Sequence, residues 1–333
     1  MTNLSKCLLG ASALILLSAC GTGASDDAST TPTSDAEVQP IGDATTPPSA
    51  GTGDTAREDI PPFGEPPVWT FADDDTTVHL FGTVHILKPE TEWRTEALDS
   101  VLTKADALYF EADVSSPEAA AEMARIVPQL GVFQDGTKLT DLLDADELKE
   151  VEEAATLIGV PMQAIEPMKP WLATVQMSVL ALQKQGYAAD SGVETVLTGL
   201  AKEQDIPLRY LESATEQLNF FADLPLEDQV EFLVASAIQI EHDPNMLDKL
   251  VEEWAEGDVD DLAAIMAEPD VMGSDAVYEI LIVERNQNWV QQIKTLMDAE
   301  EGTFLMAVGA AHLAGDDSVV EMLRADGIEV SGP

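Results

Sequence analysis

Two histidines give the clearest sign of chemistry in the sequence, because each one ends the same short pattern. Gly82 precedes His85 by three residues in GTVH, and Gly309 precedes His312 in GAAH, each after an apolar run. With 21 glycines and only four histidines, chance would supply about 0.25 such matches. A glycine allows a sharp turn or a close backbone approach, and a histidine three residues on can point back across a strand end. The repeated pattern therefore predicts a site built on both histidines.

A carboxylate extends this prediction to a metal ion. Glu111 follows the apolar run ALYF, the next strand expected after His85. Two neutral imidazoles and a carboxylate suit a divalent cation, which we leave open among Mn, Co and Zn. Such an ion would polarise a carbonyl and lower the pKa of a bound water, with Glu111 as a ligand or as the general base. The alternative, a structural role for each polar strand end, is less favoured for the matched pair.

Several other functions are excluded by missing residues or by charge. The two cysteines, Cys7 and Cys20, both precede the folded part, which leaves it without a thiol nucleophile, a thiolate zinc site or a disulfide. The chain contains neither H-E-x-x-H nor G-x-S-x-G. Its formal net charge of −46 argues against nucleic acid as a partner. The acidic residues are spread through every segment, as expected for a solvated surface adapted to high salt.

The elements that position these residues alternate between strands and helices. Two β-rich runs flank ADDD at 72–75 and predict a hairpin that ends at Gly82. Later strands are predicted at 107–114, 207–213, 303–313 and 328–332. Helices are predicted at 90–105, 116–127, 144–159, 169–186, 191–206, 226–240, 275–298 and 317–327.

This order predicts an α/β fold, with a mixed central sheet, helices on both faces and a large helical insertion. Both Gly-x-x-His patterns, Glu111 and Glu212 fall at or just past the C-terminal end of a predicted strand. Ligands bind at that edge in open α/β sheets. We therefore expect the site there.

The first 67 residues predict export and a lipid anchor. Residues 1–19 carry Lys6 and then an apolar stretch, as in a secretory signal peptide, and are too short to span a membrane stably. Cys20 ends LSAC, which resembles the bacterial lipobox, so we expect it to be lipidated; the alternative is a free thiol after ordinary cleavage. Residues 20–67 read as a disordered linker and 68–333 as the folded domain. The domain would face the periplasm or the exterior from the cell membrane or, preferably, the outer membrane.

Motifs spread along the domain resemble the TraB/GumN family. Besides the two Gly-x-x-His patterns they are ALYFEADV, LRYLES followed by EQL, ERNQNW, and FLMAVGAAHLAG followed by MLRADGIEV. The resemblance covers residues 68–330. This family includes bacterial lipoproteins, pheromone-shutdown proteins and the TIKI proteases that trim Wnt proteins. It is related to the erythromycin-esterase and ChaN-like folds, which implies such a fold here.

The resemblance implies a metal-dependent hydrolase, and within that class a peptidase acting on a peptide or protein. The family's functional residues correspond to His85, His312 and Glu111. Further motif matches are Arg285, Asn286, Glu212 and Gln217. The sequence departs from the family at Glu194, where an aspartate is commoner, which leaves Glu194 and Asp190 without an assigned role.

Two points stay open at this stage. Arg285 would steady a developing oxyanion or a substrate carboxylate, or else form an ion pair on the long helix. The chain itself would be a lipid-anchored hydrolase or, alternatively, a lipoprotein that sequesters a peptide without cleaving it.

Overall fold

The computed structural model describes residues 65–266 and 274–333. The predicted signal peptide, the lipid attachment at Cys20 and all but the last residues of the predicted linker lie outside these ranges. None of the helices in the described ranges is both long and apolar enough to cross a membrane.

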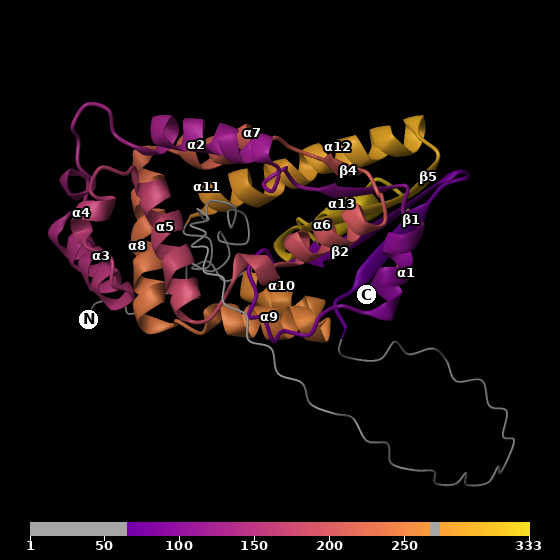
Figure 1. Ribbon diagram of the computed structural model, residues 1–333, viewed down its shortest axis with the longest axis horizontal. Coiled ribbons are helices and arrows are strands. Elements are labelled where there is room, and N and C mark those ends of the chain that lie inside the picture. Colours follow the sequence, from indigo (N-terminus) through magenta and orange to yellow (C-terminus); the bar gives the residue numbers. More distant parts are fainter. Residues whose placement is uncertain (1–64, 267–273) are drawn as a thin grey trace, which may run out of the picture. The chain divides into compact units, whose positions relative to one another are not determined.

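Five strands form one mixed sheet (Figure 1), and their order is β1-β2-β5-β3-β4. Only β1 runs antiparallel to its neighbour; the other pairs are parallel. The strands are β1 Val68–Ala72, β2 Thr76–Thr83, β3 Ala107–Phe110, β4 Leu208–Tyr210 and β5 Gly302–Gly309. The predicted mixed α/β sheet is confirmed.

The predicted hairpin is present as β1 and β2. The Asp73 carboxylate accepts the backbone N–H groups of Asp75 and Thr76 at 3.1 and 2.8 Å, which closes the turn. The strand predicted at 328–332 is wrong, because that segment pairs with β1 only through a bridge from Ser331 to Thr70. Gly332 packs against Trp69 with a φ of 143°, a conformation that ends the pairing.

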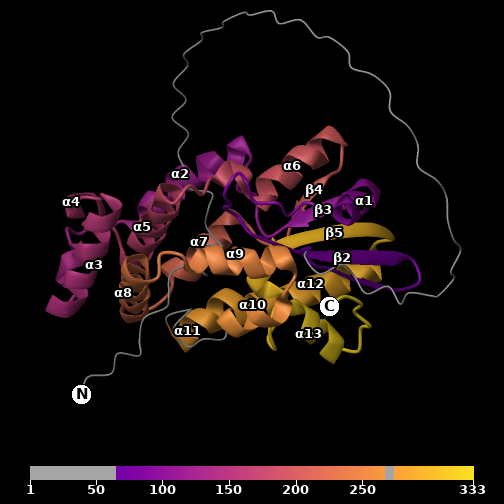
Figure 2. The same cartoon turned by 90° about the horizontal axis from the view of Figure 1, so that it is seen from below.

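Helices cover both faces of the sheet, as predicted (Figure 2). On one face α1 (Glu96–Lys104) and α6 (Val193–Glu203) share a core with Phe81 and Leu108. On the other face α12 (Glu284–Ala299) and α13 (Val319–Ala325) share a second core with Leu80 and Met306. The period-2 burial of the strands is thus satisfied on both sides.

The predicted helical insertion lies mainly between β3 and β4 and continues after β4. It has its own apolar core, in which α3 and α5 both pack against α8 (Figure 1). These helices and their neighbours are α2 Pro117–Gly131, α3 Ala145–Ile158, α4 Met162–Ile165, α5 Pro170–Lys184, α7 Ala214–Ala222 and α8 Leu226–His242.

The helical stretch at 275–298 is less regular than its sequence predicts. Instead of one helix over 275–298, a π-helical segment at Glu279–Val283 separates α11 (Asp275–Tyr278) from α12. Such π segments are often found at functional sites. Before it come α9 (Met246–Glu256) and α10 (Val259–Met266).

Candidate functional site

The carboxyl ends of the four parallel strands bring the predicted residues to one edge of the sheet. His85 lies two residues past β2, Glu111 directly follows β3, and Glu212 lies two residues past β4. His312 ends a short 3-10 turn, Ala310–His312, that directly follows β5. These strands are neighbours in the sheet, so residues up to 227 positions apart in the sequence meet.

Arg285, in the first turn of α12, is the centre of this edge. Its Nε donates to Glu212 Oε1 at 2.9 Å, and its Nη2 donates to Glu212 Oε2 at 2.8 Å and to Glu111 Oε2 at 2.6 Å. Its Nη1 donates to the backbone oxygen of Leu281 at 3.2 Å and lies 3.1 Å from His312 Nε2. A guanidinium has five N–H donors, so every one of them has an acceptor here.

The two carboxylates that hold Arg285 are equally well satisfied. Glu111 Oε1 accepts the backbone N–H of Gly309 at 2.7 Å, and Glu212 Oε1 accepts the indole N–H of Trp289 at 2.8 Å. The Gln217 amide donates to both glutamates at 3.1 Å. These residues are all buried, and burying such a set is tolerated only when its partners are present.

The second histidine of the repeated pattern belongs to this same network. His312 Nδ1 lies 2.6 Å from Asn286 Oδ1, while the Asn286 amide nitrogen donates to the backbone oxygen of Asp317 at 2.7 Å. This arrangement assigns the proton of the imidazole to Nδ1 and makes Nε2 the acceptor for Arg285. The ring also packs on Trp289, with ring centroids 4.3 Å apart.

The charges of the network are held fixed by their surroundings. Burial would raise the pKa of Glu111, but the Arg285 guanidinium and then His312 lower it to about 2. Burial and Arg285 together lower the pKa of His312 to about 3, although Glu111 opposes them. Glu111 is therefore a carboxylate and His312 a neutral imidazole at neutral pH.

His85 lies in a second arrangement, paired with Glu194. Its Nδ1 is 2.5 Å from Glu194 Oε1, which also accepts the hydroxyl of Thr83. Among protein atoms of the described residues, His85 Nε2 and Glu194 Oε2 have no hydrogen-bond partner, although both atoms are buried. Burial would lower the pKa of His85, but the Glu194 carboxylate outweighs it and the pKa is raised. The pair thus holds one open nitrogen and one open oxygen.

Local packing explains why Glu194 reaches His85. Glu194 lies in the first turn of α6, where the helix dipole favours a carboxylate. The Val193 N–H donates to the backbone oxygen of Val84 at 3.1 Å, and a Cβ on Gly192 would lie only 1.9 Å from the His85 carbonyl oxygen. Only glycine at 192 lets the start of α6 approach the end of β2 so closely.

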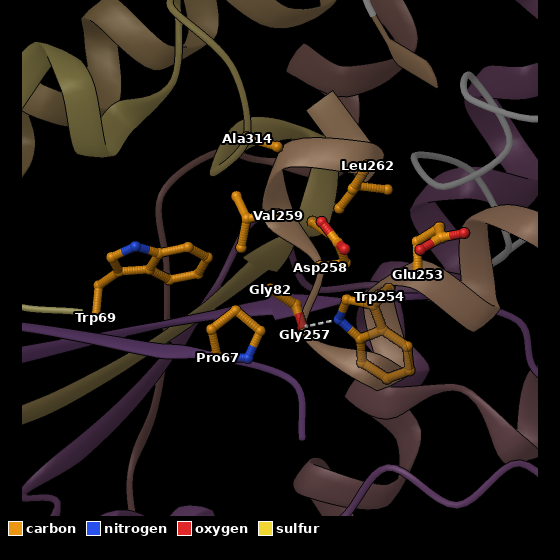
Figure 3. A pocket seen from close by; sticks show the side chains of 11 residues that line it. Pro67, Trp69, Gly82, Glu253, Trp254, Gly257, Asp258, Val259, Leu262 and Ala314 are labelled. Atoms are coloured by element: carbon orange, nitrogen blue, oxygen red, sulfur yellow. Dashed lines mark hydrogen bonds between the residues drawn. The ribbon is translucent and has the colours of Figure 1, made fainter. Parts of the chain in front are cut away.

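The two pattern glycines act through close approach and hydrogen bonding. Neither has a positive φ, so a left-handed turn is not their role. A Cβ on Gly82 would lie 3.1 Å from the Cα of Ala310, in the turn after β5. The Gly82 carbonyl accepts the indole N–H of Trp254 at 2.9 Å, beside a small apolar pocket that also contacts Val259 and Leu262 (Figure 3).

The predicted metal ligands do not converge in this arrangement. Glu111 Oε1 and His312 Nε2 are 3.9 Å apart, and both already accept N–H donors. Among the described residues, the sets of three ligand groups lying within 4.8 Å of one another include none of His85, Glu111 and His312. The donor atoms do not fit a shared metal site as they lie, so the metal stays a prediction.

The sequence assigns no site role to Glu194, Asp190 or Trp289, yet Glu194 and Trp289 both contribute to the site. Glu194 pairs with His85, whereas Asp190 is exposed in the 3-10 turn before α6. The helical spacing of Trp289 predicts a core residue; Trp289 is buried, and its indole nitrogen also donates to Glu212. The only feature of the sequence that indicated the pairing of Glu194 with His85 was Gly192, a glycine at the start of a predicted helix.

Comparison with known proteins agrees with the motif resemblance. The chain is 24% identical over 247 residues to the uncharacterized protein YbaP of Escherichia coli (strain K12), covering 74% of this chain and 87% of that protein. It has the same identity and coverage with YbaP of Shigella flexneri. No solved structure is significantly similar. Residues 67–332 match the profile of the TraB/PrgY/gumN family, and the chain belongs to this family.

Proposed function

We propose that this chain is a hydrolase that uses His85 to activate water against a carbonyl group, with peptide bonds as the first substrate class. The observation that carries the proposal is the buried, unpartnered Nε2 of His85 beside a carboxylate. A buried polar atom without a partner is costly, and such atoms mark positions where another molecule completes the bonding.

Glu194 is the residue that makes His85 suitable as a base. By accepting the Nδ1 proton it fixes the tautomer in which Nε2 carries the lone pair, and it stabilises the imidazolium that forms during reaction. The side chains of His85 and Glu194 are each 15% exposed, whereas His312 is fully buried. His85 is therefore the motif histidine that lies nearer to solvent.

The proposed reaction balances with this one acid–base group. His85 Nε2 takes a proton from water as the water oxygen bonds to the substrate carbonyl carbon. When the C–N bond breaks, the same imidazolium returns that proton to the leaving amine, and the carboxylic acid and the amine are released. All the N–H groups of Arg285 are already bonded, so Arg285 does not donate to the substrate. Its network instead holds the site residues in place and supplies a fixed electrostatic field.

The mature chain would act outside the cytoplasm. We expect Cys20 to carry a lipid that anchors the chain to the cell or outer membrane, so the substrate would be an extracytoplasmic peptide or protein. Mass spectrometry of the mature N-terminus tests this part separately.

The decisive experiment measures cleavage of a peptide library by the full chain after metal removal, and again with Mn, Co or Zn added. His85→Ala should lower cleavage by about 10²–10⁴-fold, the usual contribution of a general base. His242→Ala, at the exposed end of α8, is the matched control and should leave cleavage unchanged. Full activity of His85→Ala would refute the proposal. Peptide binding without cleavage under every condition would favour the sequestering alternative.

A further inference from the structure

We infer that Arg285 is the resident cation of the strand-edge site, bound where a metal shared by Glu111 and His312 would have to bind. Its side chain is 2% exposed, and it contacts one ligand atom of each of these residues, at 2.6 and 3.1 Å. Guanidinium groups stay charged in proteins under all ordinary conditions. The site therefore carries a permanent positive charge supplied by the chain itself.

A metal ion and this guanidinium cannot share the two ligands. Bonds from a divalent metal to imidazole or carboxylate are shorter than the hydrogen bonds that Arg285 makes to the same atoms. A metal on either ligand would therefore lie beside a fixed positive charge in a buried region, where repulsion is poorly screened. Binding would require Arg285 to withdraw.

The surroundings hold Arg285 against withdrawal. Glu212 accepts two of its N–H groups, and the Leu281 carbonyl accepts a third. The guanidinium carbon lies 4.7 Å from the centre of a Trp289 ring and 5.4 Å from the centre of the Phe220 ring. These contacts hold the guanidinium where it bonds Glu111 and His312. The site is therefore preorganised to bind arginine.

The inference concerns ion binding, so it holds whether or not the chain is a hydrolase. Where it does rest on the proposed function, it adds that cleavage proceeds after metal removal, because Arg285 already provides the positive charge.

The test is a calorimetric titration of metal-stripped full chain with MnCl2, CoCl2 and ZnCl2. All proteins carry His242→Ala, because Glu150, Glu241 and His242 lie close enough together to bind a metal independently. In the protein that retains Arg285, adding His312→Ala should leave the metal-binding titration unchanged. Stoichiometric binding that His312→Ala abolishes would overturn the inference.

A gain-of-binding variant gives the complementary result. Arg285→Met combined with Glu212→Gln removes one positive and one negative charge and frees Glu111 and His312. This variant should bind at least one of the metals tenfold or more tightly than its parent, and His312→Ala should cancel the gain. A folded double variant without any gain would reject the inference. Arg285→Lys keeps the cation and should show no gain; if the double variant fails to fold, the parent and His312→Ala titrations decide alone.

Discussion

The arginine cluster and the histidine–glutamate pair lie at the same edge of the sheet but differ in how fully their polar atoms are bonded. The arginine cluster, consisting of Arg285, Glu111, Glu212 and His312, has an acceptor for every guanidinium N–H and a donor for every carboxylate oxygen. The histidine–glutamate pair, His85 with Glu194, keeps one nitrogen and one oxygen unpartnered among the described residues.

This difference separates structural from reactive chemistry. A buried network with every group satisfied rigidifies its surroundings and resists change. A buried group left unsatisfied stores a free-energy cost that a bound water or substrate can remove. Both motif histidines follow the same Gly-x-x pattern, yet only His85 has a free ring nitrogen, so the repeated pattern does not mean a repeated role.

The largest contrast should appear in stability. Arg285→Met leaves two buried carboxylates without their cation, and breaking such a buried pair typically costs about 3–5 kcal/mol. His85→Ala removes the partner of Glu194, a carboxylate that is 15% exposed and still accepts the Thr83 hydroxyl, and should cost less than Arg285→Met. Urea unfolding followed by circular dichroism measures both changes in the free energy of unfolding. Equal losses would show that the two regions are not distinct in this way.

Lowering the pH should change the contributions of the two histidines to the free energy of unfolding in opposite directions. The pKa of His312 is lowered from 6.5 to about 3, so its neutral form contributes stability above pH 6.5 that is lost as the pH falls toward 3. The pKa of His85 is raised, so its pairing contributes stability below 6.5 that is lost as the pH rises through the folded-state pKa. Between pH 6.5 and 3 we therefore expect His312→Gln to flatten the acid loss of stability. Above pH 6.5 we expect His85→Gln to remove the stability that the parent gains as the pH falls toward 6.5.

These acid profiles are differences between variants, so the general titration of the acidic surface cancels. Unfolding free energies at half-unit pH steps provide the measurement, and the His312 effect should be the larger, on the order of a few kcal/mol. Two variants with slopes of the same sign would contradict the assignment of a neutral His312 and a carboxylate-paired His85.

The location of the site at the carboxyl edge of the sheet could be predicted from the sequence, because it depends on local patterns. Short apolar runs ending in a glycine–histidine pattern or in a glutamate indicate strand ends, and parallel strands place those ends together. Glu111, Glu212 and His312 therefore meet as the sequence order implies. The strand expected at 328–332 was wrong because a single bridge at Ser331 leaves no local signal different from a strand.

The division of roles at that edge could not be predicted, because it depends on tertiary packing. The pairing of His85 with Glu194 requires α6 to begin against the end of β2, which only the close approach at Gly192 allows. The saturation of Arg285 requires the Leu281 carbonyl, supplied by a π-helical segment inside what the sequence shows as one helix. Helical periodicity carries no information on either contact.

The smallest effect should come from Thr83, whose hydroxyl supports Glu194 from the end of β2. Thr83→Val keeps the shape of this fully buried side chain but removes a hydrogen-bond donor to Glu194. The loss in the free energy of unfolding should be about 1.5–3 kcal/mol. If the bond from His85 alone satisfies Glu194 Oε1, the loss should be nearer about 1 kcal/mol. Thr103→Val is the matched control, because that hydroxyl bonds an exposed helix carbonyl, and urea unfolding should show little change. The acid slope of His312 should be the same in Thr83→Val as in the parent, since the hydroxyl that the substitution removes bonds Glu194 and not the arginine cluster. A change in that slope would show that the pair and the arginine cluster titrate as one unit, and the comparison between them would then fail.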